Sequence, residues 1–288
     1  MLVAYRMIRL MIKNIGPLED RILVFGGPYS NLQATQAILE KAKALSIPAN
    51  HIICTGDVVA YCAQPEETAC LVSESSIHTI QGNCEENLAN DIDHCGCGFD
   101  EESLCNILAN KWYQFLQKNI SQEMVSWMGS LPQRIEFTFS GKKFHALHGA
   151  HRNISEFLFA SQSDDDILKQ IEQTDSDIIL SGHSGLPFTK IIGDKAWHNA
   201  GAIGMPANDG TARTWYSIIR GGEDGEIIFE HHALEYDHQK TANIMKESGL
   251  IDYASAIETG LWPSCDVLPA YENAQTGQRI EETKVVLI

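Results

Sequence analysis

The stretch that decides the fold is Ile52-Ile53-Cys54-Thr55-Gly56-Asp57, an apolar run that ends in a glycine and a carboxylate. Three other apolar runs end in the same way, in the polar fragments Gly82-Asn83-Cys84-Glu85, His148-Gly149 and Gly182-His183. In open α/β sheets, ligands bind beyond the carboxyl ends of the strands. The four fragments therefore predict a single site, and their carboxylate, amide and two imidazoles suit one divalent metal ion.

The composition restricts the class of protein. The chain has 288 residues, 44% of them hydrophobic, which suits one large folded domain. Its formal net charge of -17 argues against broad nucleic-acid binding. We expect no membrane-spanning segment, because no run of 18 apolar residues occurs. Eight cysteines without a secretory signal predict a cytoplasmic protein whose cysteines are thiols.

The order of predicted elements indicates a mixed α/β fold. Strand, helix, strand, helix and strand follow one another between residues 21 and 80, which predicts a parallel sheet with helices on its faces. A hairpin then joins residues 134–139 to residues 143–147 through a turn at Gly141. Later strands read as mainly antiparallel. We therefore predict two packed sheets with helices outside.

The predicted domain organisation has a single core. Residues 1–20 are interpreted as an N-terminal extension, and residues 21–235 form the main domain. A helical insert at about 88–130 breaks the regular rhythm and could act as a lid. Residues 236–288 are predicted to be a helical and irregular extension packed on the same domain, irregular after Pro263.

The order Gly56-Asp57, Gly82-Asn83, His148-Gly149, Gly182-His183 resembles the calcineurin-like metallophosphoesterase superfamily. The resemblance spans about residues 21–232 and is nearest to the prokaryotic phosphodiesterase and diadenosine-tetraphosphatase-like branch. Residues 199–206 resemble the late Asn-Pro-Gly-Ser segment of the family. The resemblance implies a four-layer αββα sandwich, two bound metals and hydrolysis of phosphate esters.

The departures from the family pattern fall on one metal site. Gly27 and Tyr29 stand where the family has Asp-x-His, and Gly185 replaces the second His of its last motif. The resemblance assigns these three positions to the first metal. The ligands that it assigns to the second metal are all retained: Asp57, Asn83, His148 and His183. The selective loss of one site therefore predicts one divalent transition metal, and two His with Asp and Asn lead us to expect Mn, Fe or Zn.

Three residues are candidates for catalysis. Cys84 stands where the family has its general-acid His; it is either a metal-bound thiolate or nucleophile, or a small buried thiol. Glu85 is either an acid or base, or a helix cap. Arg152 is either a clamp for phosphate or a partner in a surface ion pair.

Three further residues could contact substrate. Tyr29 and Asn31 would stand beside the vacated metal site, where Tyr29 could fill the space and present its hydroxyl. Asn31 is also expected to cap the following helix. His198 is either near the metal or a hydrogen-bonded core residue. Cys95 and Cys97 could bind metal or line the pocket, or simply form a turn.

The predicted function is a phosphoesterase-like hydrolase with one metal, acting on a small phosphate ester or nucleotide. Two alternatives stay open at this point: a non-catalytic protein that binds a metal or nucleotide, and altered chemistry that uses Cys84. The expected partner is a small phosphorylated substrate. An oligomer is possible, because the tail near Trp262 is apolar.

Overall fold

The computed structural model describes residues 11–100 and 102–288, so the first half of the predicted N-terminal extension lies outside the described residues. The strands are β1 (Ile12–Pro17), β2 (Arg21–Phe25), β3 (Ile52–Cys54), β4 (His78–Thr79), β5 (Arg134–Phe139), β6 (Lys142–Ala146), β7 (Ile178–Ser181), β8 (Pro187–Ile192), β9 (Lys195–Ala200), β10 (Thr214–Gly221), β11 (Ile227–Leu234) and β12 (Thr283–Leu287). The α-helices are α1 (Leu32–Ala44), α2 (Pro65–Glu74), α3 (Asn83–Ala89), α4 (Leu104–Lys118), α5 (Gln122–Ser130), α6 (Asp164–Glu172), α7 (His238–Glu247), α8 (Ile251–Thr259) and α9 (Ala270–Asn273).

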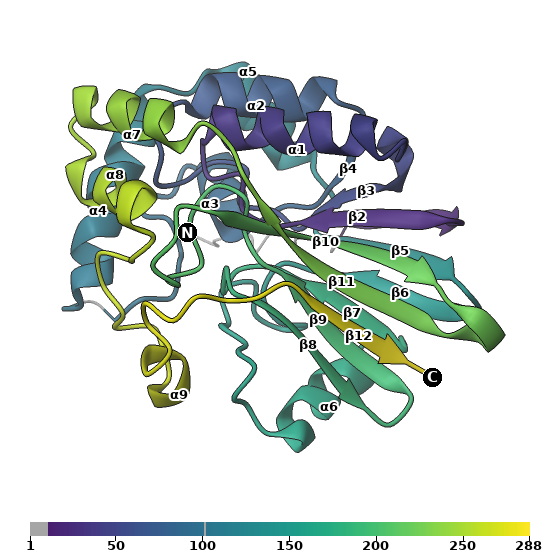
Figure 1. Cartoon of the computed structure of the whole chain (residues 1–288). Coiled ribbons are helices and arrows are strands. Elements are labelled where there is room, and N and C mark those ends of the chain that lie inside the picture. Colours follow the sequence, from purple (N-terminus) through teal and green to yellow (C-terminus); the bar gives the residue numbers. More distant parts are fainter. Residues whose placement is uncertain (1–10, 101) are drawn as a thin grey trace, which may run out of the picture.

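These strands form two mixed sheets that pack face to face (Figure 1). The first sheet has the order β1-β5-β6-β7-β9-β8, and the second has the order β12-β11-β10-β2-β3-β4. Helices α1, α2 and α5 lie over the second sheet, whereas α6 lies below the first (Figure 1). The predicted four-layer αββα sandwich is therefore confirmed.

Apolar side chains fill each of the three spaces between the layers. Strand residues such as Val24, Phe144 and Phe229 form the core between the two sheets. A larger core lies between the second sheet and its helices, and it includes Ile38 of α1 and Trp112 of α4. The third core joins α6 to the first sheet. Each layer is held by burial of an apolar face, which favours folding by about 25 cal/mol per Å².

The strands differ from the prediction at both ends of the chain. The hairpin β5–β6 forms as expected, antiparallel. Residues 12–17, predicted as part of an extension, instead form an edge strand parallel to β5. The tail is also not irregular throughout, because β12 pairs antiparallel with β11. The second half is less antiparallel than predicted, since β7 runs parallel to both β6 and β9.

The predicted insert contains α4 and α5. Three α4 side chains, Leu108, Trp112 and Leu116, are buried in the core above the second sheet. Helix α4 is therefore a packed part of the domain. Within the described part of the chain, no helix is long and apolar enough to span a membrane.

Two of the cysteines differ from the expectation that all are free thiols. Cys95 and Cys97 form a disulfide bond in the loop between α3 and α4, where only thiols were predicted. The other six cysteines are free. Sequence spacing alone did not reveal this pair, because a Cys-x-Cys motif is as typical of a turn or a metal ligand.

Candidate metal centre and the adjoining pocket

The four polar fragments meet where strands of both sheets end. Asp57 follows β3 and Asn83 follows β4, two parallel strands of the second sheet. His148 follows β6 and His183 follows β7, two parallel strands of the first sheet. The predicted convergence is therefore found, but across two sheets and not along the edge of one.

The loop that carries Asp57 is strained and tightly held. Asp57 has a φ of +54°, a conformation that costs free energy in a residue with a side chain. Gly56 before it has a φ of +92°, and a Cβ there would lie 2.9 Å from Nδ1 of His148. The Glu85 carboxylate accepts hydrogen bonds from the backbone N–H groups of Asp57 (2.9 Å) and Val59 (3.1 Å). These bonds fix the loop.

His148 lies at the centre of the cluster. Its Nδ1 is 2.6 Å from the carbonyl oxygen of Thr55, an acceptor, so Nδ1 carries the proton. Its Nε2 then faces the other three side chains. It lies 3.0 Å from Oδ1 of Asn83, 3.2 Å from Nδ1 of His183 and 3.2 Å from Oδ2 of Asp57.

The amide of Asn83 is oriented by the loop that holds the disulfide. Its Nδ2 donates a hydrogen bond to the carbonyl oxygen of Cys95 at 2.9 Å. The sulfur atoms of Cys84 and Cys97 are each 3.6 Å from the same nitrogen. The amide nitrogen therefore points away from His148, and the amide oxygen points toward it.

His183 completes the cluster from the first sheet. It has a φ of +60°, the second strained backbone position among the four residues. Its ring is tilted against that of Phe157, with the centroids 4.1 Å apart. Burial and the neighbouring His148 lower the pKa of His183 to about 3, so the ring is neutral. A neutral imidazole is the form that binds a metal.

The electrostatics of the cluster favour a cation. The ligand atoms of Asp57, His148 and His183 all lie within 4.8 Å of one another, and all three residues are buried. Burial opposes charge on Asp57, but His148 beside it lowers the pKa of the carboxyl group below its ordinary value. Against the effect of burial, Asp57 in turn raises the pKa of His148, so a metal would replace a proton at Nε2 of this ring. The Asn83 oxygen, 3.0 Å from the same Nε2, adds a fourth candidate ligand atom. A metal ion can satisfy all four at once, so these residues fit a bound metal.

The Tyr29 ring fills the space over Gly27. A Cβ on Gly27 would lie 2.3 Å from Cζ of Tyr29, so the tyrosine ring covers the glycine directly. Tyr29 has a φ of +52°, and its backbone N–H donates to the carbonyl oxygen of Asp57 at 3.1 Å. The ring therefore occupies the place where the family resemblance puts a carboxylate.

The structure does not bring three of the predicted residues to the site. Asn31 is fully buried and caps α1, and its amide nitrogen donates to Gly204 O. His198 is also fully buried, with Nε2 bonded to Ser217 and Nδ1 to Thr189. Arg152 is exposed at the surface. His198 is therefore the hydrogen-bonded core residue given as its alternative, and Asn31 has the expected cap. Contacts of Asn31, His198 and Arg152 with substrate stay predictions.

Cys84 is a small buried thiol and Glu85 caps a helix, which are the structural alternatives given for these two positions. Burial, together with Asp57 and Glu85, raises the pKa of the Cys84 thiol well above its usual range. Without a metal, this favours a neutral thiol packed beside the cluster. Glu85 is 0% exposed, and its carboxylate also accepts from the N–H of Gly82 at 2.8 Å, which caps α3. The catalytic roles suggested for these residues stay predictions.

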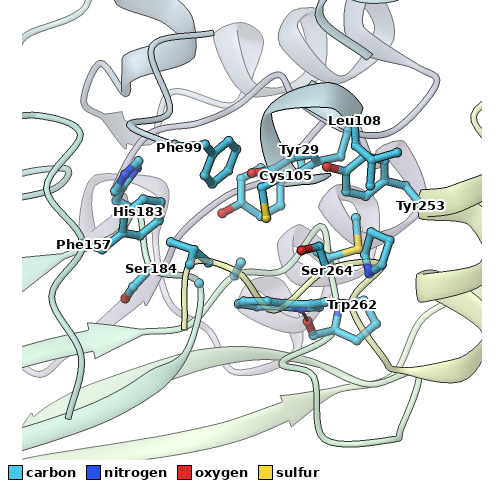
Figure 2. Close-up of a pocket in the computed structure, with 17 residues that line it drawn as sticks. Tyr29, Phe99, Cys105, Leu108, Phe157, His183, Ser184, Tyr253, Trp262 and Ser264 are labelled. Atoms are coloured by element: carbon cyan, nitrogen blue, oxygen red, sulfur yellow. Dashed lines mark hydrogen bonds between the residues drawn. The ribbon is translucent and has the colours of Figure 1, made fainter. Parts of the chain in front are cut away.

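An aromatic pocket that was not predicted lies next to His183. Figure 2 shows Trp262 facing Tyr29 and Phe99 across this pocket, with His183 and Phe157 at one end and Tyr253 at the other. All six of these rings come from loops or from a helix, at positions far apart in the chain. The irregular segments contain most of these aromatic residues, but only the fold brings them together.

The fold and the cluster define a class of protein, the metallophosphoesterases, and the comparison with known families agrees. The model of the calcineurin-like phosphoesterase superfamily domain matches residues 21–219. The chain therefore belongs to the calcineurin-like phosphoesterase superfamily.

Among individual proteins, the chain is similar to an uncharacterized protein of Methanocaldococcus jannaschii, with 29% identity over 242 residues, covering 77% of this chain and 90% of the relative. Its fold is similar to that of a metallophosphoesterase from Sphaerobacter thermophilus, with a TM-score of 0.62 and 22% identity over 83% of this chain and 99% of that one. A hypothetical protein from Pyrococcus horikoshii has a TM-score of 0.67 and 14% identity, covering 84% and 99%.

Proposed function

We propose that this protein is a phosphoesterase that holds one divalent transition metal through Asp57, Asn83, His148 and His183. The observation that carries the proposal is the convergence of four candidate ligand atoms in one buried cluster. Nδ1 of His148 is bonded to the Thr55 carbonyl oxygen, and the Asn83 amide nitrogen is bonded to the Cys95 carbonyl oxygen. Both side chains are therefore fixed with their candidate ligand atoms toward the metal position.

A single ion is proposed because Tyr29 covers a position where the family resemblance puts a ligand of the other ion. Its ring covers Gly27, and Gly185 has no side chain to offer as a ligand. A bound metal in such a site supplies a Lewis acid that polarises a phosphoryl oxygen and lowers the pKa of a bound water. The protein groups orient the phosphoryl group and shield it from bulk solvent. The proposed substrate is a small phosphate ester.

Metal content tests this proposal directly. The purified protein is stripped with chelator, loaded separately with Mn²⁺, Fe²⁺ or Zn²⁺, and analysed by elemental mass spectrometry. We expect one ion per chain, lost in His148→Ala. The matched control is His232→Ala, which removes an imidazole outside the cluster. Two ions per chain, or retention of the ion in His148→Ala, would contradict the proposed site.

Turnover separates an enzyme from a binding protein. A panel of alkyl and aryl phosphate monoesters and diesters is assayed with each metal. We expect hydrolysis that depends on the metal and is abolished in His148→Ala, since that residue lies 3.0–3.2 Å from all three other ligand groups. Metal binding without turnover of any ester would favour the non-catalytic alternative.

A further inference from the structure

The aromatic pocket borders the metal centre directly. His183 belongs to both, since it lies in the cluster of ligand atoms and also lines the pocket, next to Ser184 and Gly185. The pocket is a small cavity of about 70 Å³ that opens to solvent at its mouth. A group attached to a phosphoryl at the metal centre could therefore extend into the pocket without crossing solvent.

The chemistry of the walls selects an uncharged, planar ligand. Six aromatic residues line the pocket: Tyr29, Tyr61, Phe99, Phe157, Tyr253 and Trp262. None of the described residues that line it is an Asp, Glu, Lys or Arg. Aromatic rings pack well against other rings, in stacked or edge-to-face arrangements. A chain of further phosphates, by contrast, would enter this space without a cation to neutralise it.

Gly185 lines the pocket and adds no side chain to it. A Cβ at this position would lie 3.7 Å from the Tyr29 hydroxyl oxygen and 3.9 Å from Cζ2 of Trp262. A larger side chain at this position would therefore project between these two rings. The backbone of Gly185 has a φ of +69°, which favours glycine there.

The walls are held in place before any ligand arrives. Nε1 of Trp262 donates to the carbonyl oxygen of Pro206 at 2.6 Å, and its backbone N–H donates to Oδ1 of Asn208 at 2.8 Å. The Tyr61 ring packs against those of Tyr29 and Tyr253, with centroids 4.8 Å and 4.9 Å apart. Such preorganisation lowers the entropy cost of binding.

We propose that this pocket binds the uncharged aromatic group of a phosphate ester whose phosphoryl group lies at the metal centre. The inference rests on the proposed function and names its substrate class: aryl phosphates, and not nucleoside polyphosphates. In the hydrolysis of such an ester, the water oxygen forms a bond to phosphorus and the P–O bond to the aromatic alcohol breaks. One proton of the water ends on the released alcohol.

Calorimetric binding of two phosphonates to the Mn²⁺-loaded protein tests the inference without turnover. Phenylphosphonate carries a ring and methylphosphonate does not. Burying a ring of this size should tighten binding roughly tenfold or more, so phenylphosphonate should bind at least tenfold more tightly. ADP, whose second phosphate has no cationic partner in the pocket, should bind more weakly than phenylphosphonate.

Two variants test whether the pocket causes the preference for phenylphosphonate. Ser264→Phe fills the pocket from the segment after α8 and should abolish the preference for phenylphosphonate while leaving methylphosphonate binding unchanged. The matched control is Ser255→Phe, which places the same ring on the exposed side of α8. Trp262→Leu, which removes one aromatic wall, should reduce the preference severalfold. Equal affinity for the two phosphonates, or a preference that persists in Ser264→Phe, would overturn the inference.

A neutral ligand separates failure of the pocket from failure of the proposed function. 4-Methylphenol has the ring but no phosphoryl group, and its binding is detected by saturation-transfer NMR. It should bind the wild-type protein and not Ser264→Phe. If 4-methylphenol binds only the wild-type protein and neither phosphonate binds, the aromatic pocket is supported and the proposed phosphoesterase function is contradicted. If 4-methylphenol binds both proteins equally, the aromatic pocket is excluded.

Discussion

Glu85 lies beside candidate metal ligands, and its carboxylate accepts hydrogen bonds from the backbone. It is fully buried, and it accepts three backbone hydrogen bonds, from Asp57, Val59 and Gly82. The bonds join the loop after β3 to the start of α3. Two of the proposed ligands, Asp57 and Asn83, are positioned by these two segments.

Replacement of Glu85 by Gln tests this role. The amide has one acceptor oxygen in place of two, so at least one buried N–H loses its partner. We expect the free energy of unfolding to fall by about 1–3 kcal/mol, measured by urea denaturation. Glu86→Gln, at the next position of α3, should change it by less than about 0.5 kcal/mol. Wild-type stability together with loss of turnover in Glu85→Gln would show instead that the carboxylate is catalytic.

At the scale of single residues, the sequence predicted the ligand cluster but not the details that orient it. Asp57, Asn83, His148 and His183 each follow an apolar run, and strand ends converge in this type of fold. The groups that orient these four side chains cannot be recognised in the sequence. His148 and Asn83 are oriented by the carbonyl oxygens of Thr55 and Cys95. Every residue type has a backbone carbonyl, so the sequence does not indicate these bonds.

Among the helices, α1 depends on its N-cap residue, Asn31, for more than the cap. The Asn31 side chain accepts from the N–H of Ala34 and from the hydroxyl of Thr241, and it donates to Gly204 O. It therefore ties the start of α1 to α7 and to the loop after β9. A residue that was predicted to contact substrate links three elements.

The variant Asn31→Ala should reduce the stability of the whole domain. It removes the cap of α1 and leaves buried polar groups without partners, so we expect a loss of about 2–4 kcal/mol in thermal or urea unfolding. The control is Ser163→Ala, which removes the side-chain cap of the surface helix α6 and should cost about 1 kcal/mol. Similar losses in both variants would contradict the linking role of Asn31.

The elements themselves were largely predictable, and the exceptions have a physical reason. Hydrophobic periodicity and turn residues marked the hairpin β5–β6 and the helix that begins at Pro65. The edge strands β1 and β12 were not recognised as strands. Most residues of each strand are exposed or half-buried, with Leu287 of β12 as a buried exception. Each strand is defined by pairing with a distant strand, β5 or β11, so local sequence carries little information about it.

On the scale of the molecule, two histidines join the sheets through the core. His198 of β9 bonds through Nε2 to the hydroxyl of Ser217 in β10. His231 of β11 bonds through Nε2 to the carbonyl oxygen of Asn199 in β9. The two rings stack with centroids 4.8 Å apart. Both cross from one sheet to the other, so their protonation bears on the packing of the whole sandwich.

These histidines should make the fold sensitive to mild acid. Burial lowers the pKa of His231 to about 4, and burial with His231 beside it lowers that of His198 well below its ordinary value. In the unfolded chain a histidine titrates near pH 6.5. Between pH 6.5 and pH 4 the unfolded chain therefore binds a proton that the folded protein does not. Stability is complete above pH 6.5 and falls as the pH falls through this window.

The variant His231→Gln isolates this effect, because glutamine can keep the bond to Asn199 O but cannot bind the proton. From pH 7.5 to pH 5, the free energy of unfolding should fall by about 2 kcal/mol less in the variant than in the wild-type protein. Thr283→Val supplies the control: it removes the partner of Nδ1 of His231 but keeps the imidazole. It should lower stability at both pH values and keep the wild-type pH dependence. An unchanged slope in His231→Gln would place the acid sensitivity elsewhere, in the carboxylates that also titrate in this range.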